Sequence, residues 1–328
     1  MDAEERLSAG HRLKRTLHCV IAVLLGASLL WFFSGRQEIR DAAPPPSCPQ
    51  RPVADRAAAD RLLYNRVPKC GSTTLVHLLR RLSKSNGFSH VHSKTYNQRL
   101  LSPEEQAQFV RDMSAAPAPY SYDRHVYFVD FGQFGRPSPA YVNVIRDPVD
   151  RLVSSFYYRR AVATGVQGTG KPSRFWLSKS FQDCVRRGDE ECTFTAGQTH
   201  RSLMMPYFCG HDVRCTTVGD RWALRTAMEH VDRHFLVVGV LEDMNATLAL
   251  LEQRLPAFFR GALQLYRQFA VHQNRNERRK PVPAEIREQL RHNLSSEYEL
   301  YQRVRQRLYS QLRTLRQEDA DARAWTRR

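Results

Sequence analysis

Acidic residues are in short supply in this chain. The 328-residue sequence holds 33 aspartates and glutamates against 50 lysines and arginines, which gives a formal net charge of +17. A surplus of this size indicates anionic partners, such as nucleic acid, acidic lipid, a nucleotide or a polyanionic glycan. The hydrophobic fraction of 42% is enough for a substantial core in one large or two small domains, so the composition excludes a disordered protein.

Lysine is rare as well. Only seven of the 50 basic residues are lysines, and the other 43 are arginines. Arginine is the better bidentate partner for sulfate, carboxylate and phosphate. Genome base composition can also produce this bias, so the excess of arginine is a weak sign of function.

Charge is missing from one stretch near the start of the chain. The 17 residues from Leu17 to Phe33 carry none, and as a helix they would extend about 26 Å, marginally enough to span a bilayer. Basic residues lie before this run, so the positive-inside rule predicts a cytoplasmic tail (1–16), a transmembrane anchor (17–33) and a lumenal remainder. A cleaved signal peptide is the alternative, but Trp31, Phe32 and Phe33 are too bulky for its cleavage site.

The residues after the anchor divide into a stem and a domain. Residues 34–60 include Pro44, Pro45 and Pro46 and lack periodicity, so they are interpreted as an extended stem. Residues 61–328 would form the lumenal domain. Two glycosylation sequons begin at Asn245 and Asn293, and both can be modified only on the lumenal side.

The sequence has no C-x-x-C pair, which argues against zinc binding. Cys184 and Cys192 are eight residues apart, Cys209 and Cys215 are six apart, and each pair brackets turn-rich sequence. In an oxidising lumen these spacings predict two local disulfides. Three cysteines remain unassigned: Cys19, Cys48 and Cys70.

A phosphate-binding loop is predicted between residues 62 and 79. A short apolar run from Leu62 to Val67 meets a turn, and Leu75 begins an apolar pattern of helical spacing. Gly71 would let the backbone approach an anion, and the amides at the helix start would point toward it. Lys69 adds a charge, and three hydroxyls follow at Ser72, Thr73 and Thr74.

The same loop lacks the pattern of nucleoside triphosphatases. That pattern requires two glycines with a lysine after the second, whereas Lys69 precedes the loop's single glycine, Gly71. On this loop alone, an ordinary turn between a strand and a helix is an equally good interpretation.

Short apolar strands alternate with helices along the domain, which predicts an α/β fold with a parallel sheet covered on both faces. A capping box at Ser102 starts a helix to about Met113. The remaining predicted strands are 124–129, 141–145 and 234–241. The remaining predicted helices are one that follows Arg146-Asp147-Pro148 and runs through Tyr158, then 221–231, 243–255 and a final one from about 283. The final helix has a single apolar stripe that would pack on the domain or on another subunit.

A second candidate site lies about 75 residues after the loop. Arg146 follows a predicted buried strand, and Ser154 lies two turns into the next helix. Ligands bind at the carboxyl edge of a parallel sheet. The loop and Arg146 together would hold a nucleotide phosphorylated at both ends of its ribose, although an ion pair between Arg146 and Asp147 is the simpler interpretation of this stretch alone.

The two stretches together resemble a known family. RVPKCGSTT (66–74) and VIRDPVDRLVSSFYY (144–158) look like the 5′-phosphosulfate loop and the 3′-phosphate motif of Golgi sulfotransferases that use 3′-phosphoadenosine-5′-phosphosulfate. Four further segments resemble the uronosyl 2-O-sulfotransferases in particular: RHVYFVDF (124–131), PYFCGHDVRC (206–215), FLVVGVLED (235–243) and LPAFFRGALQLYR (255–267). The resemblance covers roughly residues 60–315 and implies a P-loop-like sulfotransferase fold after the anchor, in a single-pass type II Golgi membrane protein that acts on a glycosaminoglycan.

The resemblance also assigns roles to residues. His125 becomes the catalytic base, and Lys69 neutralises charge on the departing phosphate oxygen, which agrees with the chemistry of a weak hydroxyl nucleophile. The implied donor-binding residues are Lys69, Cys70, Gly71, Ser72, Thr73, Arg146, Ser154, Tyr266 and Lys280. The implied sugar-binding residues are Arg124, Arg160 and Arg275. Heparan-type relatives form trimers, so the resemblance implies a homo-oligomer.

One departure concerns the acceptor. The heparan-type enzymes carry His-x-His on the catalytic strand, whereas this chain has Asp123-Arg124-His125. The uronyl type has Arg-His-Val there, which favours a chondroitin or dermatan acceptor over heparan sulfate.

Three other functions remain open from the sequence. A lumenal kinase would need paired acidic ligands for Mg²⁺ beside the loop, and none is evident, so no metal is expected. An inactive glycan-binding protein could dispense with Lys69 and His125, yet both are present. A nucleic-acid binder would explain the charge but not the anchor, the stem or the sequons, so no nucleic-acid partner is expected.

Overall fold

The computed structural model describes residues 58–165, 172–270 and 281–325. The predicted tail and anchor, nearly all of the predicted stem, and the predicted ligand-binding residues Arg275 and Lys280 lie outside these ranges. Within them, no helix is both long enough and apolar enough to cross a membrane.

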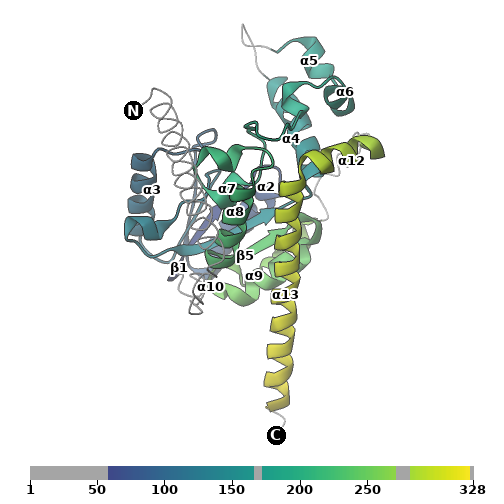
Figure 1. Cartoon of the computed structure of the whole chain (residues 1–328). Helices are drawn as coiled ribbons and strands as arrows, with labels where there is room; N and C mark the ends of the chain where they lie inside the picture. Colours follow the sequence, from purple (N-terminus) through teal and green to yellow (C-terminus); the bar gives the residue numbers. More distant parts are fainter. Residues whose placement is uncertain (1–57, 166–171, 271–280, 326–328) are drawn as a thin grey trace, which may run out of the picture. The chain divides into compact units, whose positions relative to one another are not determined.

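A five-stranded, wholly parallel sheet lies at the centre of the described domain (Figure 1). Its strands are β1 (Ala58–Asn65), β2 (Ser89–His92), β3 (Tyr120–Arg124), β4 (Pro139–Ile145) and β5 (Phe235–Val240), in the spatial order β2-β3-β1-β4-β5. Every residue of β4 is buried. Since successive side chains of a strand point to opposite faces, both faces of the sheet are covered, and the predicted fold class is confirmed.

Helices connect the strands and cover the sheet. They are α2 (Ser72–Asn86), α3 (Pro103–Ala115), α4 (Pro148–Ala163), α5 (Arg174–Ser178), α6 (Phe181–Arg186), α7 (Pro206–Cys209), α8 (Arg221–Arg233), α9 (Met244–Arg254), α10 (Pro256–Phe259), α11 (Ala262–Ala270), α12 (Ala284–Asn293) and α13 (Ser295–Trp325). The described residues also form the 3₁₀ turns η2 (Phe131–Phe134), η3 (Glu190–Cys192), η4 (Val213–Thr216) and η5 (Leu241–Asp243). The predicted capping box of α3 is confirmed, because Ser102 accepts from the Glu105 amide and Glu105 accepts from the Ser102 amide.

The predicted strand at 124–129 is wrong. The strand is β3, which ends at Arg124, and the apolar residues that follow run through the interior as irregular chain. Their amides bond outside the sheet: the Tyr127 amide donates to the Arg99 carbonyl in a loop, and the Phe128 amide donates to the Pro206 carbonyl at the start of α7. His125 therefore lies just past the carboxyl end of β3 and not within a strand.

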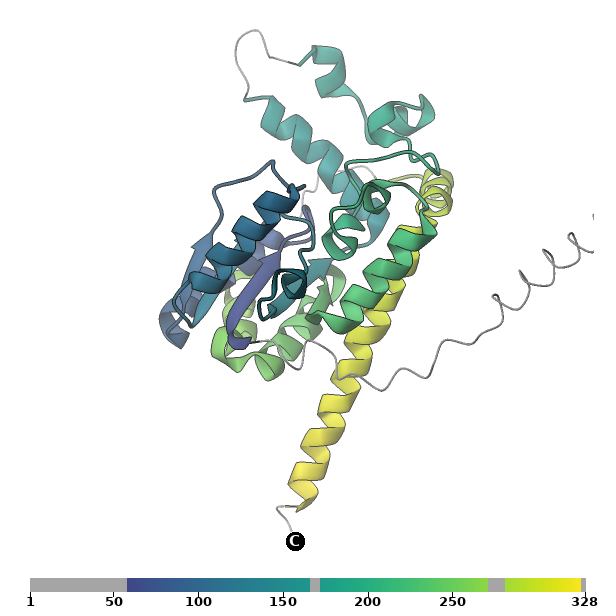
Figure 2. The ribbon, with the colours of Figure 1, turned by 60° about the vertical axis from the view of Figure 1, so that its left-hand side comes forward.

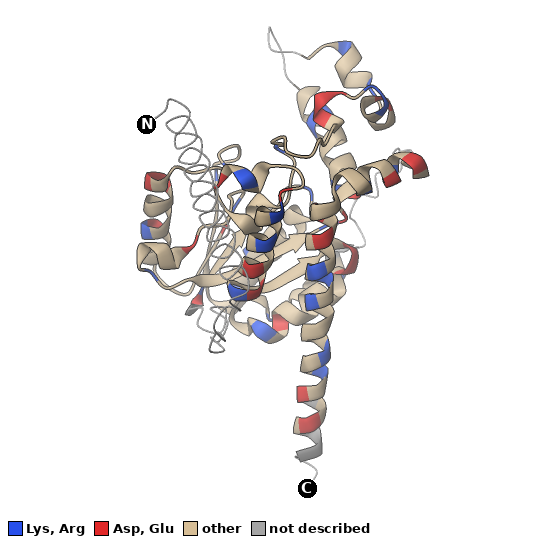
Figure 3. Cartoon of the chain, viewed as in Figure 1, with Lys and Arg blue, Asp and Glu red and all other residues tan. Residues whose placement is uncertain are grey.

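The predicted final helix is two helices, with a break at Leu294 between α12 and α13. The apolar stripe of α13 packs within the domain, against α8, β5, α9 and α4. Figure 2 shows α8 and α13 side by side, and Figure 3 shows residues of both charges along α13. The stripe is thus covered by this chain itself at Leu300, Val304 and Leu308, which are fully buried or nearly so.

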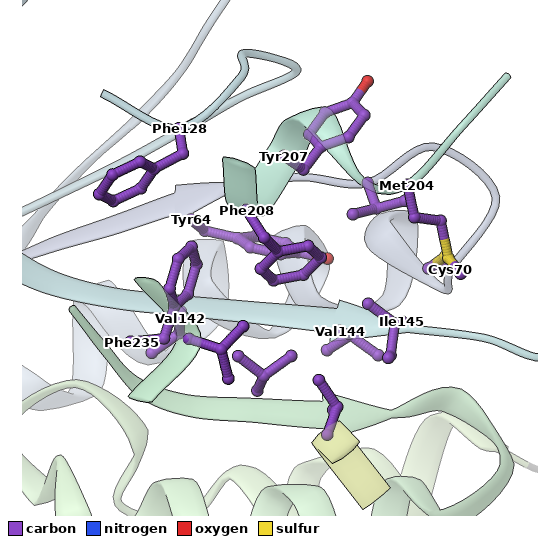
Figure 4. Close-up of a cluster of buried hydrophobic side chains, with 14 of the residues drawn as sticks. Tyr64, Cys70, Phe128, Val142, Val144, Ile145, Met204, Tyr207, Phe208 and Phe235 are labelled. Carbon is purple, nitrogen blue, oxygen red and sulfur yellow. The ribbon is translucent and has the colours of Figure 1, made fainter. Parts of the chain in front are cut away.

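Both predicted disulfides are present. Cys184–Cys192 joins α6 to η3, and Cys209–Cys215 joins α7 to η4. Among the described residues Cys70 is the free cysteine, and it is buried. Figure 4 shows it among the apolar side chains of the core, beside the carboxyl end of β4.

Candidate active site

A cavity of about 1670 Å³ opens at the carboxyl edge of the sheet. The chain leaves β1 toward β2 on one side of the sheet and leaves β4 toward β5 on the other, so the boundary between β1 and β4 is a topological switch point. Ligands of parallel α/β sheets bind at such points. The loops that follow β1, β3 and β4 all contribute to the cavity lining, through Lys69, His125 and Arg146.

The loop after β1 has the backbone of an anion-binding turn. Lys69 has a φ of 67° and Gly71 a φ of 75°, and Lys69 is the one described residue other than glycine with positive φ. Alternating backbone conformations of this kind turn successive amides toward one point. Gly71 is the N-cap of α2 and supplies no side chain to cap it, and the first turn of α2 has no acidic residue. The amides at the start of α2 therefore suit a bound anion.

Gly71 is needed for a second reason. A Cβ at this position would lie 2.5 Å from Leu241 Cδ1, in the turn that follows β5. A larger residue at position 71 would require the Leu241 side chain to shift, in addition to the strain of a side chain at positive φ.

Lys69, Ser72 and Thr73 line the cavity beside this turn. The Lys69 Nζ lies 3.6 Å from the centre of the Tyr158 ring, a cation–π contact across the cavity from α4. Tyr158 also hydrogen-bonds Tyr96, whose ring centre is 5.1 Å from that of His125. An aromatic bridge thus connects the loop lysine to the histidine.

Cys70 differs from its neighbours in the loop. Its side chain is fully buried and makes a weak contact with the Pro68 carbonyl. Burial raises the pKa of the Cys70 thiol to about 12, so the thiol is neutral at physiological pH. Only the backbone of Cys70 is in a position to contact an anion in the cavity.

Arg146 and Ser154 both line the cavity. Arg146 follows β4 directly, and Ser154 is a buried residue of α4. Asp147 has other partners: it accepts from the Asp150 amide as the N-cap of α4, and from the Tyr298 hydroxyl at 3.0 Å. The Asp147 carboxylate is thus bound by groups other than Arg146, which weakens the interpretation of the two residues as an ion pair.

His125 lies at the bottom of the cavity, with 2% of its surface exposed. Its Nδ1 is 2.8 Å from the Arg66 carbonyl oxygen. Since a carbonyl only accepts, Nδ1 carries the proton and Nε2 is left with a free lone pair. Burial, followed by the positive charge of Arg66, lowers the pKa of His125 to about 4. The imidazole is therefore neutral near pH 7, as a general base must be.

The structure does not bring every predicted residue into the cavity. Arg160 is buried behind it, bound to Glu191 at 2.6 Å and packed between the rings of Phe156 and Trp176. Arg124 is not among the lining residues, and its guanidinium donates to the Gln98 backbone and side-chain oxygens. Tyr266 lies on α11, which packs against α2 and α9 and contributes no residue to the lining.

Several lining residues were not predicted from the sequence. Tyr96, Arg99, Tyr158, Arg159 and Arg201 all reach the cavity. Tyr158 lies four residues after Ser154 on α4, so helical spacing could have revealed it, whereas Arg159 lies one residue further on. Tyr96, Arg99 and Arg201 come from irregular loops, for which no periodic pattern exists. The Arg99 Nε is buried and has no hydrogen-bond partner among the described residues.

The cavity thus combines a loop suited to an anion with a neutral histidine. Comparison with protein families names the class of protein: residues 54–302 match the Sulfotransferase family, and the chain belongs to that family.

The chain is also similar to individual sulfotransferases of known activity. The chain is 36% identical to mouse uronyl 2-sulfotransferase over 262 residues, which is 76% of this chain and 62% of the mouse protein. It is 35% identical over 279 residues to the Drosophila melanogaster uronyl 2-sulfotransferase homolog pip, covering 79% of this chain and 54% of the fly protein. The Xenopus laevis heparan sulfate 2-O-sulfotransferase 1 is 37% identical over 217 residues, 63% of this chain and 58% of that protein. The chain thus spans a little over half the length of these relatives.

Proposed function

We propose that this chain is a glycosaminoglycan uronosyl 2-O-sulfotransferase, which moves a sulfuryl group from 3′-phosphoadenosine-5′-phosphosulfate to the 2-hydroxyl of a uronic acid. The observation that carries the proposal is that three sequence motifs share one cavity. An anion-binding loop, an arginine–serine pair and a neutral histidine line it together, although they come from three separate parts of the sequence.

The residues present fit the donor's two anionic ends. Gly71 leaves the amides of the loop open on one side of the cavity, where Lys69, Ser72 and Thr73 would hold the phosphosulfate. Arg146 and Ser154 would hold the 3′-phosphate from β4 and α4. When bound, the donor supplies the sulfuryl group, whose bond to the phosphate oxygen breaks as the bond to the sugar oxygen forms.

His125 and Lys69 divide the proton and charge transfers of this reaction. His125 Nε2 accepts the proton of the sugar hydroxyl as that oxygen bonds to sulfur. The Lys69 ammonium stabilises the negative charge that develops on the departing phosphate oxygen. Lys69 would leave the Tyr158 ring to do so, because a phosphate is a stronger partner for an ammonium group than an aromatic face.

For the acceptor we propose chondroitin or dermatan sulfate, on the basis of the Arg124-His125-Val126 sequence. Heparan sulfate is the alternative, since relatives named for either activity match the chain at similar identity. The test is to incubate the purified domain with radiolabelled donor and separate desulfated heparan, chondroitin and dermatan chains. Labelling of none of the three would contradict the proposed function, and labelling of heparan alone would contradict the proposed acceptor.

The site of action follows from the N-terminal sequence. We propose a single-pass Golgi protein anchored by residues 17–33, with the catalytic domain in the lumen. We also propose a homo-oligomer. This proposal is supported by the family resemblance alone, since the apolar stripe of α13 is already covered by the domain and offers no surface for a second subunit. A monomeric mass in light scattering of the lumenal domain would exclude the oligomer.

A further inference from the structure

A buried carboxylate lies two residues before His125. Asp123 is the penultimate residue of β3, and none of its surface is exposed. Three basic side chains surround its two oxygens: Arg66 Nε at 2.9 Å, His90 Nε2 at 3.2 Å and His92 Nδ1 at 2.9 Å. Burial alone would raise the pKa of Asp123, but the close approach of His90 and the charge of Arg66 bring it below its usual value. Asp123 is therefore a buried anion at neutral pH.

Arg66 connects this anion to the catalytic histidine. Its side chain is buried, and the contact of Nε with Asp123 Oδ1 has the orientation of an ion pair and not of an aligned hydrogen bond. Its backbone is fixed at two points: the amide donates to the Arg124 carbonyl at 2.8 Å, and the carbonyl accepts from His125 Nδ1 at 2.8 Å. One residue is thus held by Asp123 through its side chain, while its carbonyl orients His125.

We propose that Asp123 is a positioning residue that acts on His125 through Arg66, keeping the imidazole in the tautomer whose Nε2 accepts a proton. The proposal rests on the transfer reaction proposed above, in which Nε2 takes the proton of the sugar hydroxyl. Asp123 itself is not among the residues that line the cavity, so it touches neither substrate.

Asp123 also supports the basicity of His125, through its negative charge. Arg66 and Arg99 both disfavour a protonated imidazole, and Asp123 is the charge that opposes them. Without Asp123, the Arg66 cation would be buried with no anion beside it, a costly arrangement that draws the guanidinium toward other partners. The Arg66 carbonyl would then lose its fixed position, and His125 would become a weaker base as well as a less ordered one.

The first test is Asp123→Asn, which keeps the shape and removes the charge. Turnover should fall by about 10- to 100-fold, the usual scale for losing a group that orients a catalytic residue, while donor affinity stays within about twofold. The matched control is Asp112→Asn, the same change at an exposed residue of α3 whose partner is Gln108. The control should keep the wild-type rate.

The decisive measurement combines this change with His125→Ala. If Asp123 acts through His125, Asp123→Asn should not lower the residual rate of His125→Ala any further, because residues that act as a unit are not additive. An equal loss in both backgrounds would mean that Asp123 merely supports the fold, and would overturn the proposal. Wild-type turnover of Asp123→Asn would overturn it too.

Nitrogen NMR of the His125 ring gives a readout that needs no activity. The wild-type ring should show its proton on Nδ1, and Asp123→Asn should produce a mixture of tautomers or a lower pKa. If Asp123→Asn fails to fold, the double variant Arg66→Met with Asp123→Leu removes both charges without leaving one unpaired. In this variant too, the ring proton of His125 should no longer be confined to Nδ1. An unchanged ring in a folded variant would overturn the proposal, whereas a changed ring in a protein that transfers no sulfuryl group would overturn the proposed function alone.

Discussion

At the scale of single residues, the protonation state of His125 determines how activity depends on pH. A general base is active when it is deprotonated, so activity should be present above the pKa of His125 and be lost as the pH falls through that value. Burial lowers this pKa to about 4. A plot of kcat/KM should therefore be flat from pH 8 down to about pH 5.5 on its acid side, with no inflection near 6.5. A half-maximal rate near pH 6.5 that moves on His125→Asn would contradict this expectation.

Lys69 and His125 should be separable by mutation. His125→Ala should reduce turnover by about 100-fold or more and leave donor affinity nearly unchanged, because a base acts on the acceptor proton. Lys69→Ala should reduce turnover and also weaken donor binding, because the ammonium contacts the phosphosulfate both before and during transfer.

Arg146→Ala is the reference for a change that acts on binding alone, since the 3′-phosphate is remote from the reacting sulfur. Calorimetry with the desulfated nucleotide, run beside kinetics on all three variants, separates these cases. Near-normal turnover of His125→Ala would show that another residue is the base.

The sequence could single out Lys69, Gly71 and Arg146 because each lies beside a recognisable element boundary. His125, by contrast, was singled out only by the resemblance to a family. The sequence could not show that Arg160 is sequestered, since that depends on Glu191 and Trp176 approaching it from a separate segment. Nor could it show that Cys70 turns inward, because the direction of a side chain in a tight loop depends on backbone angles that no sequence pattern reveals.

At the scale of elements, Glu297 couples α13 to the segment behind the site. Its two carboxylate oxygens accept from the Met204 and Met205 amides, each at 2.8 Å, and only 3% of its surface is exposed. Glu297→Ala leaves these two buried amides without partners, so stability should fall by about 2 to 4 kcal/mol. Thermal unfolding should then show a Tm lower by roughly 5 to 15 °C.

Glu299→Ala is the matched control on the same helix. Glu299 pairs with Arg221 at the surface, where both side chains are well exposed. Its removal should change stability by less than about 0.5 kcal/mol. If the two variants unfold at the same temperature, Glu297 does not hold α13 to the segment around Met204.

The elements themselves were largely predictable from the sequence. Periodicity and capping residues predicted β1, β4, β5 and most of the long helices to within a few residues, but β2 was not predicted. The prediction of a strand at 124–129 failed because an apolar run indicates burial but does not say what its backbone pairs with. The break at Leu294 was not predicted because the apolar stripe continues across it.

At the scale of the whole molecule, the proposed lumenal location can be tested through the two sequons. Asn245 is exposed on α9, and Asn293 is half-buried at the end of α12. Protein made in mammalian cells should shift in mobility after glycosidase treatment, and Asn245→Gln and Asn293→Gln should each remove part of the shift. The absence of any shift, together with a C-terminus accessible from the cytosol, would reject the proposed topology.

The hydrogen bond between His125 and Arg66 has a consequence for chemical labelling. With Nδ1 committed to the Arg66 carbonyl, Nε2 is the ring nitrogen whose lone pair is free to attack an electrophile. An acylating reagent small enough to enter the cavity should therefore give a single regioisomer at His125 and stop there, without the doubly modified ring that exposed histidines form. A covalent inhibitor designed for this protein would need to approach its histidine from the Nε2 side alone.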